Sequence, residues 1–281
     1  MKLGQTIDQP ISQLAPAQVL RRFLHWKRVA LFSKKPQLMD FMGQHILVDA
    51  ASPTTVEDYV LGLREFEAMS FMLHYLRKDS FLVDIGAGTG SYSMLAAGIR
   101  EAFVLGFESD EDLRERYLKH IEINQLASYV VTDKRLVRFK EQAVVKQGEE
   151  EDEIGSEMEG EHRLAVALDD LDLQQAPDMV RINAKGYTLE VIRGMGDMLQ
   201  QASLQAILLR LDRKAEVEVE RLCHELLVAN GFSLVTYNCA DRSLQPTDRF
   251  GEGNHLYVRD VEAVQLQLSL SPPIPYYGKE L

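Results

Sequence analysis

The stretch that most constrains the fold of this chain is residues 81–92, which read FLVDIGAGTGSY. Its apolar first half predicts a buried strand, and its end predicts the start of a helix. Between them, glycines occupy the alternate positions Gly86, Gly88 and Gly90. A strand that passes through a glycine turn into a helix is typical of the ligand site of an open α/β sheet. Glycines suit that turn because they tolerate positive φ and let a ligand approach the backbone closely.

An acidic residue follows at the position where a nucleotide-binding sheet would use it. Residues 102–107 form the next apolar run, which predicts a second strand ending at Glu108. A carboxylate about 20 residues after the glycines can accept hydrogen bonds from both hydroxyls of a ribose. The alternative is that Glu108 only caps a helix that starts at Asp110. The strand, the glycines and the acid together predict a nucleotide-type cofactor site.

Two cofactors fit such a site, NAD and S-adenosylmethionine. A pyrophosphate requires a free helix N-terminus beneath the glycines, and Asp84 at the strand end would repel it. The same carboxylate would suit the ammonium group of a methionyl moiety. Residues 231–237 and 254–258 predict two final strands with no helical pattern between them, hence an antiparallel pair, which is typical of methyltransferases and unusual in NAD domains. The sequence therefore favours S-adenosylmethionine, with Asp84 near its methionyl end.

The third strand is predicted at residues 136–139, with a further apolar fragment at 142–145. In this type of sheet the loop after the third strand lies over the adenine, which makes Gln142 and Ala143 candidates for that wall. The full set of expected cofactor-binding residues is Asp84, Gly86, Ala87, Gly88, Gly90, Glu108, Ser109, Gln142 and Ala143.

Composition narrows the classes of function. The chain has 281 residues and a formal net charge of −12, which argues against nucleic acid as its main partner because phosphate binding needs a basic face. The two cysteines, Cys223 and Cys239, form neither a disulfide framework nor a metal-binding pattern, which indicates a reduced, cytoplasmic setting. No apolar run approaches 18 residues, so no transmembrane segment is expected.

The remaining patterns divide the chain into three parts. Residues 1–54 form an N-terminal helical extension, residues 55–262 a methyltransferase domain, and residues 263–281 a proline-rich tail. Within the domain, residues 55–77 predict one helix, and the acidic segment 148–162 predicts a mobile loop because like charges repel one another.

The extension contains a basic amphipathic helix at residues 17–32. Such a helix either packs on its own domain or touches an anionic membrane surface or an acidic partner. Both interpretations stay open at this stage, as does homo-oligomerisation.

In order and spacing, the motifs of residues 55–260 resemble the FkbM family of S-adenosylmethionine-dependent methyltransferases. The similarity lies in GLREFE at 62–67, VDIGA at 83–87, GFES at 106–109, IEIN at 121–124, ALDDL at 167–171 and LEVIRG at 189–194. The resemblance implies an α/β fold of the Rossmann-like class I methyltransferase type. That fold has a seven-stranded, mostly parallel sheet with helices on both faces and a C-terminal antiparallel strand pair. It also implies O-methylation of a hydroxyl on a sugar, glycan or polyketide-like metabolite.

One departure from the family pattern affects the expected chemistry. Where the family usually carries Lys-Ile-Asp-Val-Glu-Gly at the end of the fourth strand, residues 181–186 read RINAKG. Asn183 can hydrogen-bond but cannot take a proton, and Lys185 reverses the charge, so no metal ligand is expected here. Lys185, if its pKa is lowered by burial, is the candidate base, and Asn183 is the candidate for orienting the acceptor. The competing interpretation is a non-catalytic protein that keeps the fold as a cofactor-binding or scaffolding module.

Overall fold

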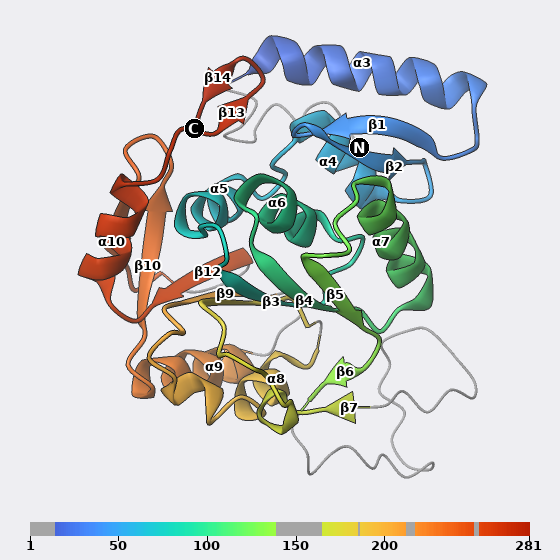
Figure 1. The fold of residues 1–281 in the computed structure, drawn as a ribbon. Coiled ribbons are helices and arrows are strands. Elements are labelled where there is room, and N and C mark those ends of the chain that lie inside the picture. The colour runs from blue at the N-terminus through green and yellow to red at the C-terminus, as the bar shows by residue number, and fades with distance from the viewer. Residues whose placement is uncertain (1–14, 139–164, 185, 212–216, 250–252) are drawn as a thin grey trace.

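The computed structural model describes residues 15–138, 165–184, 186–211, 217–249 and 253–281. Its centre is an eight-stranded sheet with the strand order β11-β10-β12-β9-β8-β3-β4-β5 (Figure 1). The strands are β3 (Phe81–Ile85), β4 (Phe103–Phe107), β5 (Val130–Asp133), β8 (Met179–Ile182), β9 (Ala206–Leu211), β10 (Ser233–Asn238), β11 (Ser243–Pro246) and β12 (Gly253–Val258). Strands β9, β8, β3, β4 and β5 are parallel to one another. Strands β12, β10 and β11 follow on the side of β9, each antiparallel to its neighbour.

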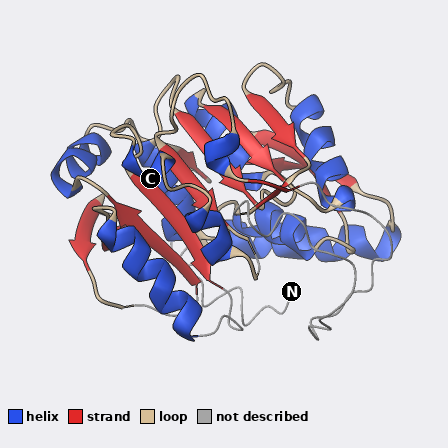
Figure 2. Ribbon diagram, turned by 90° about the horizontal axis from the view of Figure 1, so that it is seen from below, coloured by secondary structure: helices blue, strands red, loops and turns tan. Residues whose placement is uncertain are grey.

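Helices cover both faces of this sheet (Figure 2). One face carries α4 (Pro53–Leu61), α5 (Phe66–Tyr75), α6 (Ser91–Arg100), α7 (Glu111–Ile123) and α10 (Val261–Ser269), with α3 (Pro16–Phe32) on their outer side (Figure 1). The other face carries α8 (Thr188–Arg193) and α9 (Val217–Ala229). The two-residue alternation of strand side chains divides the core accordingly, because Leu82 packs with the first group of helices and Val83 with the second.

This strand order is that of the Rossmann-like class I methyltransferase fold, so the predicted fold class is confirmed. The predicted antiparallel pair is β10 and β12. The sheet has one strand more than the seven expected, because β11 is added at its edge. The sequence did not indicate this strand because it is short and lies in the connection between β10 and β12.

Two predicted elements were wrong. The third sheet strand is β5, whereas Leu136–Val137 form a separate strand, β6, that pairs in parallel with β7 (Ala165–Val166) outside the main sheet. The single helix expected at residues 55–77 is two helices, because Gly62 ends α4 with a φ of 74° and α5 starts only at Phe66. A positive φ is accessible to glycine at little cost, which makes it a natural helix end.

The extension and the tail share the core of the domain. A hairpin of β1 (Gln37–Phe41) and β2 (Gln44–Val48) lies beneath α3, and both contribute buried residues to the core that contains α4 and α5. In the proline-rich tail, β13 (Pro275–Tyr276) pairs with β14 (Lys279–Glu280). Tyr276 is fully buried, and its hydroxyl donates to the carbonyl of Leu61 at 2.8 Å. This segment therefore packs against the C-terminal end of α4.

Two further elements are short 3₁₀ turns, Leu168–Asp170 and Met198–Gln200. In the part of the chain that the structure describes, none of the helices is both long and apolar enough to cross a membrane. The predicted acidic loop lies outside the described residues.

Candidate functional site

A cavity of about 960 Å³ opens at the carboxyl ends of β3, β4, β8 and β9. In open α/β sheets, ligands bind at this edge, where the strand order reverses on either side of the first strand. One end of the cavity is walled by the glycine loop, Glu108, Ser109 and Asp110. The other end is walled by apolar and polar side chains of α5, β9, β10 and β12, namely Phe66, Phe71, Leu208, Val235, Thr236, Tyr237, Asn254 and Leu256.

The glycine loop between β3 and α6 needs glycine at each of the three alternate positions. Gly86, Gly88 and Gly90 have φ values of 70°, 61° and 86°. A Cβ on Gly86 would lie 2.2 Å from the backbone oxygen of Asn183, and one on Gly90 would lie 2.1 Å from the ring of Tyr117. A Cβ on Gly88 would meet nothing within 4 Å. The loop is therefore closed against the protein at both ends and open to the cavity at its centre.

Glu108 joins the second strand to the glycine loop. Its Oε2 accepts the amide of Gly88 at 2.7 Å, and its Oε1 accepts the amide of Asp110 at 2.8 Å. Burial raises the pKa of Glu108, and these two amides partly oppose the rise. The side chain lines the cavity and fixes the loop, while the cap of α7 is Asp110 itself, which accepts the amide of Leu113 at 3.0 Å. The alternative that Glu108 serves only as a cap is therefore not what the geometry shows.

Asp84 lies beneath the cavity and does not line it. Its side chain is fully buried, and Arg181 on β8 places Nη1 2.7 Å from Asp84 Oδ1. Ser93 donates its hydroxyl to the other carboxylate oxygen at 2.8 Å. Burial alone would lower the pKa of Arg181, but the Asp84 carboxylate, Tyr92 and Glu65 together outweigh that effect and raise it. The expected contact of Asp84 with a methionyl group is thus replaced by an ion pair inside the protein.

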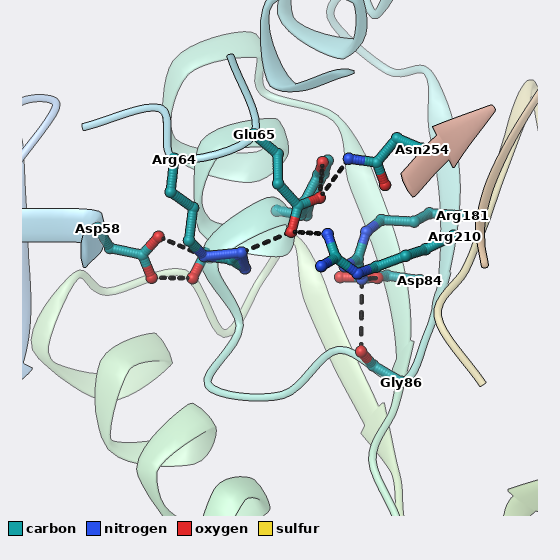
Figure 3. A network of polar contacts seen from close by, with 10 residues as sticks. Asp58, Arg64, Glu65, Asp84, Gly86, Arg181, Arg210 and Asn254 are labelled. Carbon is teal, nitrogen blue, oxygen red and sulfur yellow. Dashed lines mark hydrogen bonds and ion pairs between the residues drawn. The ribbon is translucent and has the colours of Figure 1, made fainter. Parts of the chain in front are cut away.

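A second ionic group lies in the break between α4 and α5 (Figure 3). Glu65 Oε1 is 2.7 Å from Arg64 Nη1 and 2.9 Å from Arg210 Nη1. Glu65 Oε2 accepts the hydroxyl of Tyr92 at 2.7 Å and the amide of Asn254 at 3.1 Å. Elements far apart in the sequence therefore meet at one carboxylate.

The Glu65 carboxylate has four donors for its roughly four acceptor positions. Burial alone would raise its pKa, but the guanidinium groups of Arg64, Arg181 and Arg210 together with the Tyr92 hydroxyl lower it to about 2. Glu65 is therefore ionised at neutral pH and has no spare lone pair with which to act as a base. Asp58, whose Oδ1 is 2.9 Å from Arg64 Nε, is the opposite case, since its burial raises the pKa to about 6.

The structure brings most of the expected cofactor residues together. Gly86, Ala87, Gly88, Glu108 and Ser109 line the cavity. Gly90 supports the loop from below, against the ring of Tyr117. Where residues after the third strand were expected to wall the cavity, the described wall is formed by Arg135, Leu136 and Val137.

The candidate catalytic pair is described only in part. Asn183 lines the cavity at the end of β8. Lys185 lies outside the described residues, as do Gln142 and Ala143. Among the residues that the structure places, no three His, Cys, Asp or Glu side chains gather in a way that could hold a metal ion.

Sequence reasoning missed the arginines of the wall, among them Arg64, Arg181 and Arg210. The one available signal was Gly62, because a glycine within an apolar periodic run can end a helix. Recognising that end would have placed Arg64 and Glu65 in a loop near the glycine turn.

The strand order and the glycine loop define a Rossmann-like class I methyltransferase fold. No protein-family model and no curated protein sequence matches this chain. Among solved structures, it is similar to precorrin-6y C5,15-methyltransferase from Geobacter metallireducens, with 16% identity and a TM-score of 0.43 over 69% of this chain and 87% of that one. It is also similar to TYW2 from M. jannaschii in complex with AdoMet, with 15% identity and a TM-score of 0.43 over 81% and 88% of the two chains.

A third similar structure is magnesium protoporphyrin IX methyltransferase from Synechocystis PCC 6803 with bound SAM. Its identity is 16% and its TM-score 0.45, over 76% of this chain and 87% of that one. Because these similarities are distant, the fold assignment rests on the strand order and on the glycine loop.

Proposed function

We propose that this chain is a methyltransferase that binds S-adenosylmethionine over the glycine loop, with Glu108 on the ribose. The carrying observation is that Glu108 and Gly88 meet at one wall of the cavity, joined by a 2.7 Å hydrogen bond. Each Glu108 oxygen accepts one backbone amide, which leaves acceptor capacity on both oxygens for the two ribose hydroxyls. Gly88, which has open space where a side chain would be, lets the cofactor lie close to the backbone.

The hydrogen bonds of the loop argue against NAD. The amides of Gly86 and Ala87 both donate to the carbonyl of Phe107 at 2.9 Å, and the amide of Gly90 donates to Ala87. The amide of Gly88 already has a carboxylate partner in Glu108. A pyrophosphate needs such amides free. Because Asp84 is neutralised by Arg181, what disfavours NAD here is the occupied amides and not a charge at the strand end.

For the reaction, we propose O-methylation of a hydroxyl on a sugar, glycan or polyketide-like metabolite, as the FkbM resemblance implies. Bound S-adenosylmethionine supplies an activated methyl group, so the protein's main task is to align the acceptor hydroxyl. Asn183 lines the cavity at the end of β8, where its amide can orient a hydroxyl. Arg210, Asn254 and Thr236 supply polar groups at the far end of the cavity. Lys185 stays a candidate base on sequence grounds.

We also propose a cytoplasmic location, because the two cysteines are free thiols.

Calorimetric titration with S-adenosylmethionine and with NAD tests the cofactor. Glu108→Ala should weaken S-adenosylmethionine binding by about tenfold to a hundredfold, the usual effect of removing a charged hydrogen-bond partner. Glu101→Ala is the matched control, because Glu101 lies in an exposed ion pair with Lys78 on the same domain. Binding of NAD in place of S-adenosylmethionine, or equal affinity in both variants, would refute the assignment.

The acceptor can be sought with methyl-labelled cofactor and a panel of hydroxylated sugars and polyketides. Asn183→Leu should remove turnover while cofactor affinity stays within a few-fold, since Asn183 is assigned to the acceptor. Label found on nitrogen or carbon in the product would contradict O-methylation.

One observation favours a second candidate, a cofactor-binding module without turnover. Of the acids on the described wall, Glu65 is saturated by four donors, and the fourth strand ends in Asn183 where the family carries an acid. Asn183→Asp combined with Lys185→Glu restores the family's acids. If S-adenosylmethionine binds but neither the natural protein nor this double variant transfers label to any acceptor, the module is the better description.

A further inference from the structure

Helix α3 has two apolar sides, and only one of them is used by the fold. Val19, Phe23 and Trp26 are buried against the domain. Arg22 fixes the same side, since its Nη1 donates to Asp40 at 3.0 Å and its guanidinium lies 4.3 Å from the ring centre of Tyr59. This side accounts for the interpretation that the helix packs on its own domain.

A second apolar stripe follows another side of α3, about a third of a turn from the buried one. Leu20, Leu24 and Leu31 are spaced by four and seven residues, which places them on one face of a helix. All three are exposed, Leu31 by 80%, and Phe32 at the helix end is exposed by 84%. Among the described residues, this is where exposed large apolar side chains gather along one element, and α3 lies along the outer edge of the molecule (Figure 1).

Positive charge accompanies this stripe. Residues 9–39 contain six lysines and arginines and no acid, in a chain with a formal net charge of −12. Arg22 is held by Asp40, whereas Arg21, Lys27, Arg28, Lys34 and Lys35 are all exposed. An exposed face that is both apolar and basic, on a strongly acidic protein, matches a surface that is apolar and anionic.

We propose that the outer side of α3 docks the protein on an anionic lipid membrane surface. The helix would lie flat, with Leu20, Leu24, Leu31 and Phe32 inserted at the boundary between headgroups and acyl chains and the cations against lipid phosphates. A nucleic acid would use the cations but has no need for a row of leucines. A folded protein partner would need a surface whose shape is complementary to this row of side chains. A lipid surface is fluid and can accommodate separate side chains that protrude from a helix.

Docking is tested by flotation with vesicles of phosphatidylcholine alone and of phosphatidylcholine with added phosphatidylglycerol. The full chain should float only with the anionic vesicles, and less so at high salt, because salt screens the charges. Leu24→Glu with Leu31→Glu should lower vesicle binding by more than about tenfold, since two leucines leave the lipid and two acids face it. Lys27→Gln should lower it by about fivefold, the effect of one cation near an anionic surface.

The matched control places the same two substitutions on another exposed surface, as Leu266→Glu with Leu270→Glu on and just after α10. Leu266 and Leu270 are exposed by 62% and 74%, so exposure and charge change are comparable, and vesicle binding should decrease far less. Circular dichroism of each variant establishes that it is folded. Trp26, the single tryptophan, faces the domain and should not be quenched by brominated lipid.

Three results would overturn the proposal. The first is the absence of flotation with anionic vesicles at low salt. The second is equal binding by the α3 variant and the α10 control. The third is a loss of self-association or of RNA binding, rather than vesicle binding, in the α3 variant, which would assign the face to a second copy or to a nucleic acid.

Discussion

Arg181 Nη1 lies 2.7 Å from Asp84 Oδ1, and both side chains are buried under the glycine loop. The two residues are paired across neighbouring strands, β3 and β8, at the same level of the sheet. The same Arg181 nitrogen is 3.4 Å from the carbonyl of Gly86, and its guanidinium lies 4.0 Å from the ring centre of Tyr92. The floor of the cavity is therefore an internal ion pair that shapes the loop rather than a ligand contact.

Breaking this pair should mainly affect stability. Asp84→Asn leaves a buried guanidinium without its charge partner, and we expect a loss of about 3–5 kcal/mol in the free energy of unfolding, measured with urea. Glu101→Gln, which breaks the exposed pair with Lys78, should change the unfolding midpoint little because exposed pairs contribute little. The combined change Asp84→Leu with Arg181→Met should cost less than the single change. An unaltered midpoint in Asp84→Asn would show that the pair is not needed for folding.

The sequence predicted the strands that position the cofactor loop because those strands are short, apolar and bounded by turn residues. Phe81–Ile85 is the apolar start of residues 81–92, and Phe103–Phe107 lies within one residue of the predicted run 102–107. The third strand was missed for a physical reason. Residues 130–133 read VVTD, a run too short and polar to compete with LVRF a few residues later, and only its pairing with β4 makes it a sheet strand.

The polar half of the site could not be predicted in the same way. Glu65, Arg210 and Asn254 are separated by more than 40 residues at each step, so nothing local in the sequence indicates that they meet. The partner of Asp84 could not be predicted either. An acid at a strand end can face the ligand or the protein. Asp84 faces the protein because the pairing of β3 with β8 places Arg181 beside it.

Glu65 should behave as an anchor and not as a base. Glu65→Gln removes the charge that positions Arg64 and Arg210, so we expect lower turnover and a loss of unfolding free energy of about 3 kcal/mol. Because the pKa of Glu65 is about 2, its titration should contribute no limb to the pH–rate profile between pH 4.5 and neutrality. A limb in that range that disappears in Glu65→Gln would show that the carboxylate takes part in proton transfer.

His74 should make stability depend on mild acid. Its Nδ1 is 2.6 Å from the hydroxyl of Tyr237, and burial, with a smaller effect from Arg242, lowers its pKa from 6.5 to about 4. A pKa that is lower in the folded state means that the stabilisation is complete above pH 6.5 and is lost as the pH falls towards 4. In urea unfolding, the natural protein should lose more stability over that interval than His74→Gln, which does not titrate. Parallel pH dependence in the two proteins would contradict the assignment.

The three loop glycines should separate folding from ligand binding. Gly88→Ala should cost about 1–2 kcal/mol of unfolding free energy through its φ of 61°, since no atom lies within 4 Å of the new Cβ. Gly278→Ala is the matched control, because Gly278 has a φ of 81° and equally open space, but it lies in the C-terminal hairpin. Both variants should lose similar stability in urea, whereas only Gly88→Ala should weaken S-adenosylmethionine in calorimetry, because its methyl group projects where the ligand would lie. Gly86→Ala should be worse than either, by at least about 3 kcal/mol, because its Cβ would lie 2.2 Å from the Asn183 oxygen. If Gly88→Ala bound the cofactor as tightly as Gly278→Ala does, the cofactor would not lie over this loop.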